Sequence, residues 1–334
     1  MHELKERLSV ALDRHAQSLV HFGNDVFAHP EIGYREGRTA TRVAEALARL
    51  DLPVEEGLAV TGVRAVLRGN KPGPVVCVMG ELDGLPVPGH PNADPATGVA
   101  HACGHNAQLA HLLGVATAMI ECDAARELAG DIVFLAVPAE EYVDLEWRAD
   151  LARRGKVEFF GGKAELLRLG AFDGVDMAMM VHASGTPNGN RLSMSWDYNG
   201  FVAKRARFIG RAAHAGNAPF RWINALNAAT LAMQAIHMQR ETFVDEDHVR
   251  IHPILTHGGD AVNVVPADVR LETFVRGASL EAIEQAAAKV DRSLKAGALA
   301  VGAAVEIQTL PGYLPLHVDR ELGALFRDNA RRLV

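Results

Sequence analysis

Cysteine is scarce in this chain, and its scarcity limits the classes of protein to which the chain can belong. Three cysteines in 334 residues, Cys77, Cys103 and Cys122, are too few for the disulfide framework of a small secreted domain. We therefore expect a protein of a reducing compartment, the cytoplasm. A cysteine in such a chain is either a small buried side chain or a chemically active thiol.

Long apolar runs and an excess of basic charge are also missing. No stretch approaches the ~20 apolar residues that cross a bilayer, and residues 1–7 are charged, unlike a secretory signal. The net charge of −7 and the pI near 6.1 argue against a nucleic-acid partner, which favours a basic surface. We expect neither a membrane nor a nucleic acid as partner.

The chain is long enough for two domains, and its first part alternates between helix and strand. The composition, 49% hydrophobic and 22% charged, is that of an ordinary globular protein. Helices are predicted at 4–28, 39–50, 107–120 (with Asn106 as N-cap) and 163–169, and strands at 63–67, 75–79, 132–137 and 175–181. This alternation predicts an α/β fold with a mostly parallel sheet and helices on both faces.

From about residue 199 the predicted elements follow the order β-α-β-β-α-β. The strands are expected at 201–209, 249–255, 269–275 and 305–310, and the helices at 225–240 and 280–299. This order is that of the ferredoxin-like α+β fold. We therefore expect a first domain at 1–190, an inserted domain at 191–310, and a return to the first domain at 311–334.

Chemically active side chains follow the apolar strands of the first domain. Four of them lie just past the carboxyl end of a strand, namely Asp83, Glu140, Glu141 and His182, and residues 101–105 lie between a strand and the next helix. Ligands of open α/β sheets bind at the carboxyl ends of the strands. These side chains are therefore expected to meet at one edge of the sheet.

The sequence His-Ala-Cys-Gly-His at residues 101–105 has the donor types of a metal site. In an extended segment His101, Cys103 and His105 project to the same side. A thiolate with imidazoles, close to carboxylates, suits a borderline-soft divalent metal. The alternative is a buried free cysteine beside helix-capping residues, which is the commoner meaning of an isolated Cys-x-His, so the metal site requires ligands from neighbouring strand ends.

The pair Glu140-Glu141 combines a possible metal ligand with a possible base. Adjacent side chains at a strand end diverge, so one can bind a metal while the other reaches a metal-bound water. The metal lowers the pKa of that water, and the carboxylate removes its proton. Asp83 can bridge two metals or orient a ligand histidine, although Asp-Gly is also a good turn former. Two solvated acids are the alternative for the pair.

Three polar residues of the second domain have side chains that suit a substrate. His214 lies among small residues at 210–216, Asn263 lies at 258–266, and Arg276 follows a predicted strand. A neutral histidine and an asparagine amide can stabilise an oxyanion, and arginine suits a carboxylate. Each of the three, taken alone, is equally typical of a polar surface.

Seven stretches in order along the chain resemble the dinuclear-metal amidohydrolases of the aminoacylase and carboxypeptidase type. The likeness is greatest to the branch of indole-acetyl-amino-acid, hippurate and aminobenzoyl-glutamate hydrolases. The stretches are 29–31 (HPE), 81–86 (ELDGLP), 101–106 (HACGHN), 138–141 (PAEE), 181–182 (VH), 210–216 (GRAAHAG) and 261–266 (AVNVVP). They span nearly the whole chain, and together they are highly specific.

The resemblance implies a zinc-exopeptidase-like fold whose inserted domain is a dimerisation lid. It implies two divalent metal ions, zinc, manganese, cobalt or nickel, among which ligand type alone does not choose. Glu140 would be the general base. The implied metal ligands are Cys103, His105, Glu141 and His182.

The resemblance also implies roles for the second domain. His214 would stabilise the oxyanion, and Asn263 or Arg276 would hold a substrate carboxylate, with the lid of a homodimer reaching the partner's active site. The function expected is metal-dependent cleavage of the amide bond of a small N-acyl or N-aroyl amino acid, or a related amide. The alternatives are a dipeptidase or carboxypeptidase, a hydrolytic deaminase of an aromatic amino acid, and a homologue without catalysis.

The chain departs from the family pattern in three places. Asn106 stands where many members have aspartate. Residues 142–162 form a longer segment than expected, which either shapes substrate access or is an ordinary surface insertion, and we favour the insertion. Members carry a further metal-binding histidine near the C-terminus, whereas this sequence stops at Val334 inside an amphipathic helix. We therefore expect a truncated chain that lacks one ligand and holds its metals weakly or not at all.

Overall fold

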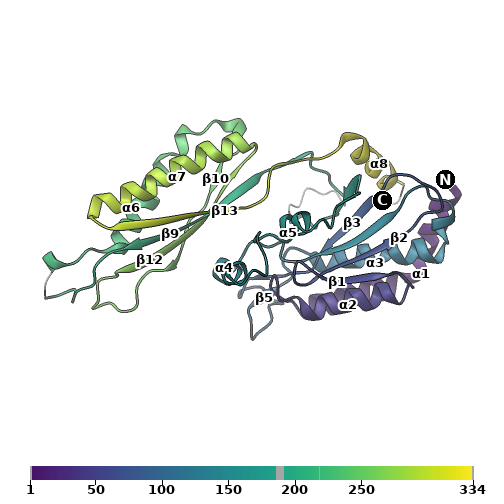
Figure 1. Ribbon diagram of the computed structural model, residues 1–334, viewed down its shortest axis with the longest axis horizontal. Coiled ribbons are helices and arrows are strands. Elements are labelled where there is room, and N and C mark those ends of the chain that lie inside the picture. The colour runs from purple at the N-terminus through teal and green to yellow at the C-terminus, as the bar shows by residue number, and fades with distance from the viewer. Residues whose placement is uncertain (1, 186–191, 218, 333–334) are drawn as a thin grey trace. The chain divides into compact units, whose positions relative to one another are not determined.

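The computed structural model describes residues 2–185, 192–217 and 219–332 (Figure 1). The chain divides into two compact units, Met1–Pro187 and Asn188–Val334. Among the described residues, every helix is too short or too polar to cross a membrane.

The first unit is built on a five-stranded sheet of order β1-β2-β6-β3-β7. Its strands are β1 (Val54–Leu58), β2 (Gly62–Leu67), β3 (Val76–Glu81), β6 (Ile132–Val137) and β7 (Met177–Met179). β3 pairs in parallel with β6 and β7, whereas β2 is antiparallel to both β1 and β6. β2 therefore runs against the other four strands, and the sheet is mostly parallel in direction but mixed in pairing.

Helices cover both faces of this sheet (Figure 1). α1 (His2–Phe27), α2 (Gly37–Ala48) and α3 (His105–Glu121) pack on one face, and α5 (Gly162–Arg168) packs on the other. The side chains of β6 alternate between the two cores, with Phe134 in the first and Leu135 in the second. Every residue of β6 is buried, as its unbroken apolar sequence predicts for a strand covered on both faces.

Four details of the first unit differ from the sequence-based expectation. α3 begins at His105, and its N-cap is Gly104, whose φ of 81° suits glycine, so Asn106 is not the cap. The Asn106 side chain donates to the Gly23 carbonyl instead, at 3.2 Å. β7 is shorter than predicted, β1 was not predicted, and the segment after the glutamate pair contains a helix, α4 (Leu145–Arg153).

The second unit has the predicted β-α-β-β-α-β order. Its sheet has the order β10-β12-β9-β13 with all pairs antiparallel, which is ferredoxin-like connectivity. The elements are β9 (Gly200–Ile209), α6 (Ala225–Met238), β10 (Arg250–Ile251), β11 (Ile254–His257), β12 (Asp268–Gly277), α7 (Leu280–Val301) and β13 (Ala304–Pro311). The strand predicted at 249–255 is divided into β10 and β11 around Pro253, which has no N–H for the ladder.

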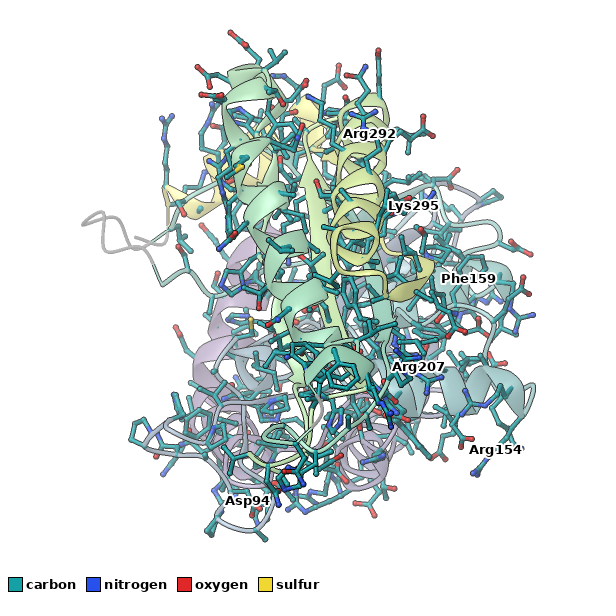
Figure 2. The ribbon with its side chains drawn as sticks, turned by 90° about the vertical axis from the view of Figure 1, so that its left-hand side faces the viewer. Asp94, Arg154, Phe159, Arg207, Arg292 and Lys295 are labelled. Carbon is teal, nitrogen blue, oxygen red and sulfur yellow. The ribbon has the colours of Figure 1, made fainter. Side chains whose placement is uncertain are left out.

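α6 and α7 lie side by side on one face of this sheet (Figure 2). Their core is made of small and aliphatic side chains, among them Ala228, Ala232 and Leu294, packed against Phe208 and Leu271 of the sheet. Arg292 and Lys295 lie on the exposed side of α7. The helix pair therefore buries an almost wholly apolar face.

The C-terminal segment of the described chain also packs within the second unit. β14 (Leu316–His317) pairs with β8 (Asp197–Tyr198), and α8 (Arg320–Ala330) follows, with the Asp319 side chain accepting from the N–H of Leu322. The Arg320 guanidinium lies 4.8 Å from the ring centroid of Trp196. The assignment of residues 311–334 to the catalytic domain stays a prediction.

Candidate metal centre

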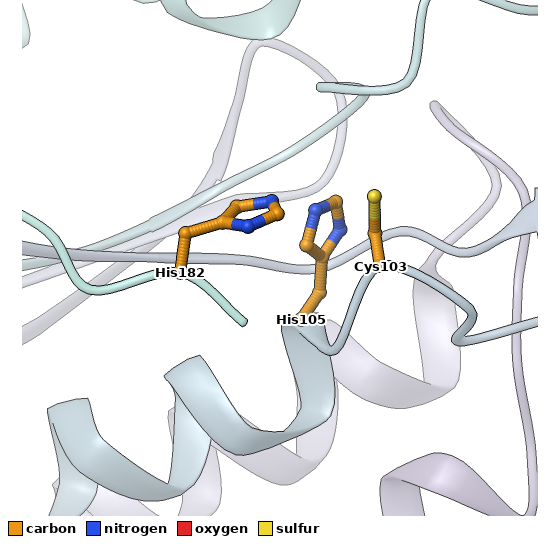
Figure 3. A group of neighbouring side chains, drawn as sticks. All are labelled: Cys103, His105 and His182. Carbon is orange, nitrogen blue, oxygen red and sulfur yellow. The ribbon is translucent and has the colours of Figure 1, made fainter. Parts of the chain in front are cut away.

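Three donor side chains converge where the strands of the first unit end (Figure 3). The sulfur of Cys103 and one ring nitrogen each of His105 and His182 lie within 4.8 Å of one another. The two imidazoles meet edge to face, with centroids 5.8 Å apart. Cys103 lies in the loop between β5 (Val99–Ala100) and α3, His105 opens α3, and His182 follows β7. One thiolate and two imidazoles are typical ligands of zinc and similar ions.

His105 is wholly buried and has a fixed orientation. Its Nδ1 lies 2.7 Å from the backbone oxygen of Asp83. A carbonyl oxygen can only accept, so Nδ1 carries a proton and Nε2 is left to face other groups. A carbonyl behind the ring is the usual support of a metal-binding histidine. Asp83 therefore orients His105, and its carboxylate accepts from the N–H of Glu141 at 2.9 Å.

A second group of donors joins the first through His105. Glu81, His105 and Glu140 each offer an atom within 4.8 Å of the other two. His105 Nε2 lies 3.0 Å from Glu81 and 3.8 Å from Glu140. Lys163, at the start of α5, contacts Glu81 and lies 3.7 Å from Glu140. The base candidate thus stands beside the metal-ligand candidates.

The charges of this region shift the pKa values of its members. Burial raises the pKa of Glu140 to about 7, and the Glu81 carboxylate makes the second largest contribution in the same direction. Burial also acts to raise the pKa of Glu81, but Lys163 and His105 outweigh it and hold that pKa well below its usual range. The Cys103 side chain raises the pKa of His182 to about 9. A carboxylate with a pKa near neutrality is suited to act as a general base.

Unpaired buried atoms indicate that this region suits a cation. Glu81 Oε2, Asp83 Oδ1, His105 Nε2 and Glu141 Oε1 have no hydrogen bond of good geometry to the described residues. Such an atom costs about 1–3 kcal/mol when it is left unpaired. With Nδ1 protonated, His105 Nε2 and the facing Glu81 oxygen both present lone pairs, which repel unless a proton or metal ion lies between them. The donor set therefore fits a divalent metal.

The structure brings together most, but not all, of the site residues predicted from the sequence. Cys103, His105, His182 and Glu140 lie in the two groups, whereas the Glu141 carboxylate lies in neither. Glu81 and Lys163 were not foreseen. Glu81 had a detectable signal, because it lies two residues before Asp83 and therefore on the same side of an extended strand, whereas the sequence gave no indication of Lys163.

The polar residues predicted in the second unit fall into two places. His214 and Asn263 are exposed neighbours, since the N–H of Ala215 donates to the Asn263 carbonyl at 3.1 Å. Arg276 lies at the opposite end of β12, roughly 25–30 Å along the strand from the end that follows Asn263. Its guanidinium packs on the rings of Phe201 and Phe274. Arg276 is therefore not brought together with the other two residues.

Comparison with known proteins places this site in a family. The sequence profile described as "Peptidase family M20/M25/M40" matches residues 77–334. Thermostable carboxypeptidase 2 of Saccharolobus solfataricus is 25% identical over 333 residues, which cover 95% of this chain and 78% of the relative. N-acyl-L-amino acid amidohydrolase of Geobacillus stearothermophilus is 27% identical over 93% of this chain and 81% of the relative.

A solved structure supports the same placement at the level of the fold. The crystal structure of the Bacillus subtilis YXEP protein, titled a dinuclear metal binding peptidase, matches with a TM-score of 0.64. Its sequence is 22% identical, and the match covers 96% of this chain and 80% of that one.

Because the family profile matches well over half of its residues, the chain belongs to the peptidase family M20/M25/M40. The family resemblance and the α/β fold class predicted from the sequence are confirmed. The protein is a metal-dependent hydrolase of amide bonds, of the amidohydrolase and peptidase type.

Proposed function

We propose that the first unit holds two divalent metal ions at the ends of β3, β6 and β7 and cleaves the amide bond of a small N-acyl or N-aroyl amino acid. The observation that carries the proposal is the convergence of Cys103, His105 and His182 within 4.8 Å. The name of the Geobacillus relative, which specifies N-acyl-L-amino acids, supports the substrate class. Zinc, manganese, cobalt and nickel all suit the donors.

The residues of this chain have distinct roles in the proposed reaction. Cys103, His105, His182 and Glu141 would hold the ions. A divalent ion bound by these residues would polarise a carbonyl and lower the pKa of water. Glu140 takes a proton from the attacking water and returns it to the leaving amine, a task for which its position beside His105 and its pKa near 7 are suited.

His214 and Asn263 are proposed to act on the substrate from the second unit of a homodimer. The histidine would stabilise the oxyanion, and the asparagine would bind the substrate carboxylate. Their adjacency supports a shared role. Arg276 is the weaker candidate for the carboxylate, because it lies at the other end of β12.

A second candidate function is that of a carboxypeptidase or dipeptidase. The name of the Saccharolobus relative favours it. The same metal centre and base would act, and only the acyl side of the substrate would differ.

A substrate panel on the metal-loaded full chain tests these proposals. We expect hydrolysis of N-acetyl and N-benzoyl amino acids at rates above those of matched dipeptides, lost on chelation and in Glu140→Gln. Faster cleavage of the dipeptides would favour the carboxypeptidase, and ammonia release from an aromatic amino acid would identify a deaminase. Full turnover by Glu140→Gln would contradict the role of Glu140.

A further inference from the structure

The segment after the glutamate pair, residues 142–161, is organised around one buried arginine. Arg148 of α4 has no exposed surface and is the largest wholly buried side chain of the described chain. The neighbouring Arg153 and Arg154 are by contrast more than 60% exposed. An ordinary surface insertion does not need a fully buried guanidinium.

Arg148 donates its hydrogen bonds to the main chain on both sides of Glu140. Nη1 donates to the carbonyl of Ala139 at 3.1 Å and to the carbonyl of Phe160, and Nη2 donates to the carbonyl of Glu141. The first and last of these residues flank Glu140 directly. One planar fork therefore binds the carbonyls of the residues directly before and after the proposed base.

Two further buried side chains complete this arrangement. Glu36 accepts from the N–H of Ala139 at 2.7 Å, and Asp83 accepts from the N–H of Glu141 at 2.9 Å. The N–H and carbonyl groups of both flanking residues are thus held by side chains. The backbone here belongs to no helix or strand, and Ala139 has a φ of 50°, which is strained for a residue other than glycine. Secondary structure does not fix Glu140. The side chains hold this loop together with two backbone hydrogen bonds, from the N–H of Gly162 to the Ala139 carbonyl and from the N–H of Val143 to the Glu141 carbonyl.

The guanidinium is also tightly enclosed. The rings of Tyr34 and Tyr142 lie 5.4 and 5.5 Å from its central carbon. A Cβ added to Gly33 would lie 2.7 Å from Arg148 Nη2 and 2.9 Å from the Ala139 Cα. Arg148 therefore cannot shift without moving the loop that it holds.

Filling this space with an arginine lowers the stability of the folded chain more than an apolar side chain would. A buried charge is costly unless it is paired, and no ion pair joins Arg148 to a carboxylate within the described part of the chain. An apolar side chain of similar size would fill the volume without that penalty. Such a side chain could not supply the donors that Arg148 directs at the carbonyls of Ala139, Phe160 and Glu141.

We propose that Arg148 is a positioning residue for Glu140. Its guanidinium fixes the main chain before and after that residue and so keeps the Glu140 carboxylate beside His105. This inference rests on the proposed function in one respect, the role of Glu140 as base. Residues 142–161 are then part of the catalytic apparatus rather than a surface insertion.

Three variants distinguish an effect on the position of Glu140 from an effect on the stability of the fold. Arg148→Met keeps an unbranched side chain, shorter than that of arginine, and removes its donors, whereas Arg148→Lys keeps one charged donor group. Leu47→Ala is the matched control, because Leu47 is a wholly buried apolar side chain of α2 in the same unit, and its core cluster contains no residue of the loop around Glu140. Each variant is assayed for kcat, KM, bound metal and Tm.

We expect a loss of kcat that stability does not explain. Arg148→Met should lower kcat about 100-fold, the effect of displacing a catalytic group by about 1 Å, with KM and bound metal changed little. Arg148→Lys should lower kcat by roughly tenfold, because an ammonium cannot span both carbonyls. Leu47→Ala should lower Tm as much while kcat stays within about threefold of wild type. Equal kcat losses at equal Tm for the methionine and alanine variants would overturn the proposal.

A crystal structure of Arg148→Met, or of Arg148→Lys if the methionine variant does not fold, gives a readout that needs no activity. We expect the carbonyls of Ala139 and Glu141 to turn and the Glu140 carboxylate to leave His105. A Glu140 that stays in place would overturn the proposal. If the wild type hydrolyses no amide, the proposed function fails, while this comparison still decides whether Arg148 positions Glu140.

Discussion

The two units of the chain differ in what they bury. Among the described residues, the buried polar side chains of the second unit are Lys204, Thr273 and Ser293, and the lysine is paired with Asp291. The first unit buries a much larger set, comprising Glu36, Thr39, Glu81, Asp83, His101, His105, Gln108, Arg148 and Glu165. The second unit shows that a compact sheet and helix pair can be built on an almost wholly apolar core.

This difference indicates that the buried charges of the first unit serve catalysis and not stability. Buried polar groups reduce stability unless each is paired, and several atoms around His105 are not paired within the described chain. Glu81, Asp83, His105 and Glu141 each carry such an atom where the strands end, close to Cys103 and Glu140. Unpaired buried groups thus lower the stability of the first unit at one edge of its sheet, as expected where side chains serve catalysis in an active site.

The largest effect is expected from His105→Ala. His105 belongs to both donor groups, so its loss should remove metal and reduce hydrolysis to background. Elemental analysis after dialysis, together with the amide assay, measures both. A variant of the second unit such as Lys295→Ala, on the exposed side of α7, should retain both metal and activity. Full metal content in His105→Ala would contradict the proposed site.

Glu140→Gln is expected to separate catalysis from metal binding. The amide cannot take a proton from water, so kcat should fall about 10²- to 10⁴-fold. Metal content should be unchanged if Glu141, and not Glu140, is the ligand. A loss of metal that parallels the loss of rate would show instead that Glu140 binds the ion.

Gly33→Ala should destabilise the first unit by about 1–3 kcal/mol, the usual effect of overpacking. The new methyl group would overlap with Arg148 and Ala139, which lie 2.7 and 2.9 Å away. Gly37→Ala is the control, because a Cβ there meets nothing within 4 Å. Chemical denaturation measures both variants, and equal stabilities would show that the loop around Ala139 is looser than described.

Glu36→Gln should change how stability depends on pH. Burial, and next the Asp83 charge, raise the pKa of Glu36 from 4.5 to about 8. The folded chain therefore holds one more proton than the unfolded chain between these values, and the stability contributed by this group, complete below pH 4.5, is lost as pH rises through 8.

The glutamine variant cannot titrate, so it should remove up to about 1.4 kcal/mol per pH unit from the slope in that window. Glu45→Gln, half exposed on α2, should leave the slope unchanged. The free energy of unfolding at several pH values between 5 and 8 measures the difference. An unaltered slope in Glu36→Gln would mean that Glu36 is ionised in the folded chain.

The smallest effect is expected on the surface of the second unit. Arg207 pairs with Asp268 at 3.0 Å, but its side chain is 49% exposed (Figure 2). Arg207→Ala should therefore change the free energy of unfolding by at most about 1 kcal/mol. A loss several times larger would show that the second unit also depends on its charges.

The sequence predicted those features that depend on local pattern. Buried strands such as β6 and the amphipathic helices have a clear periodicity, and polar residues after strand ends must meet at one edge of the sheet. For this reason Cys103, His105, Glu140 and His182 could be named in advance. The order of elements was likewise enough to predict the ferredoxin-like connectivity of the second unit.

The features that could not be predicted depend on contacts between distant residues. Glu36 and Ala139 are 103 positions apart, and nothing in either local sequence indicates their hydrogen bond. Arg148 lies close in sequence to Arg153 and Arg154, and only the fold shows that it alone is buried. The length of β7 likewise depends on its pairing with β3, its single neighbour among the described strands of the sheet.

Metal ligation by Cys103 is tested most directly by X-ray absorption spectroscopy of the zinc-loaded protein. We expect a sulfur neighbour at about 2.3 Å together with nitrogen and oxygen neighbours at about 2.0–2.2 Å. The sulfur signal should disappear in Cys103→Ser. A wild-type spectrum with nitrogen and oxygen neighbours alone would contradict a metal centre built on Cys103, His105 and His182.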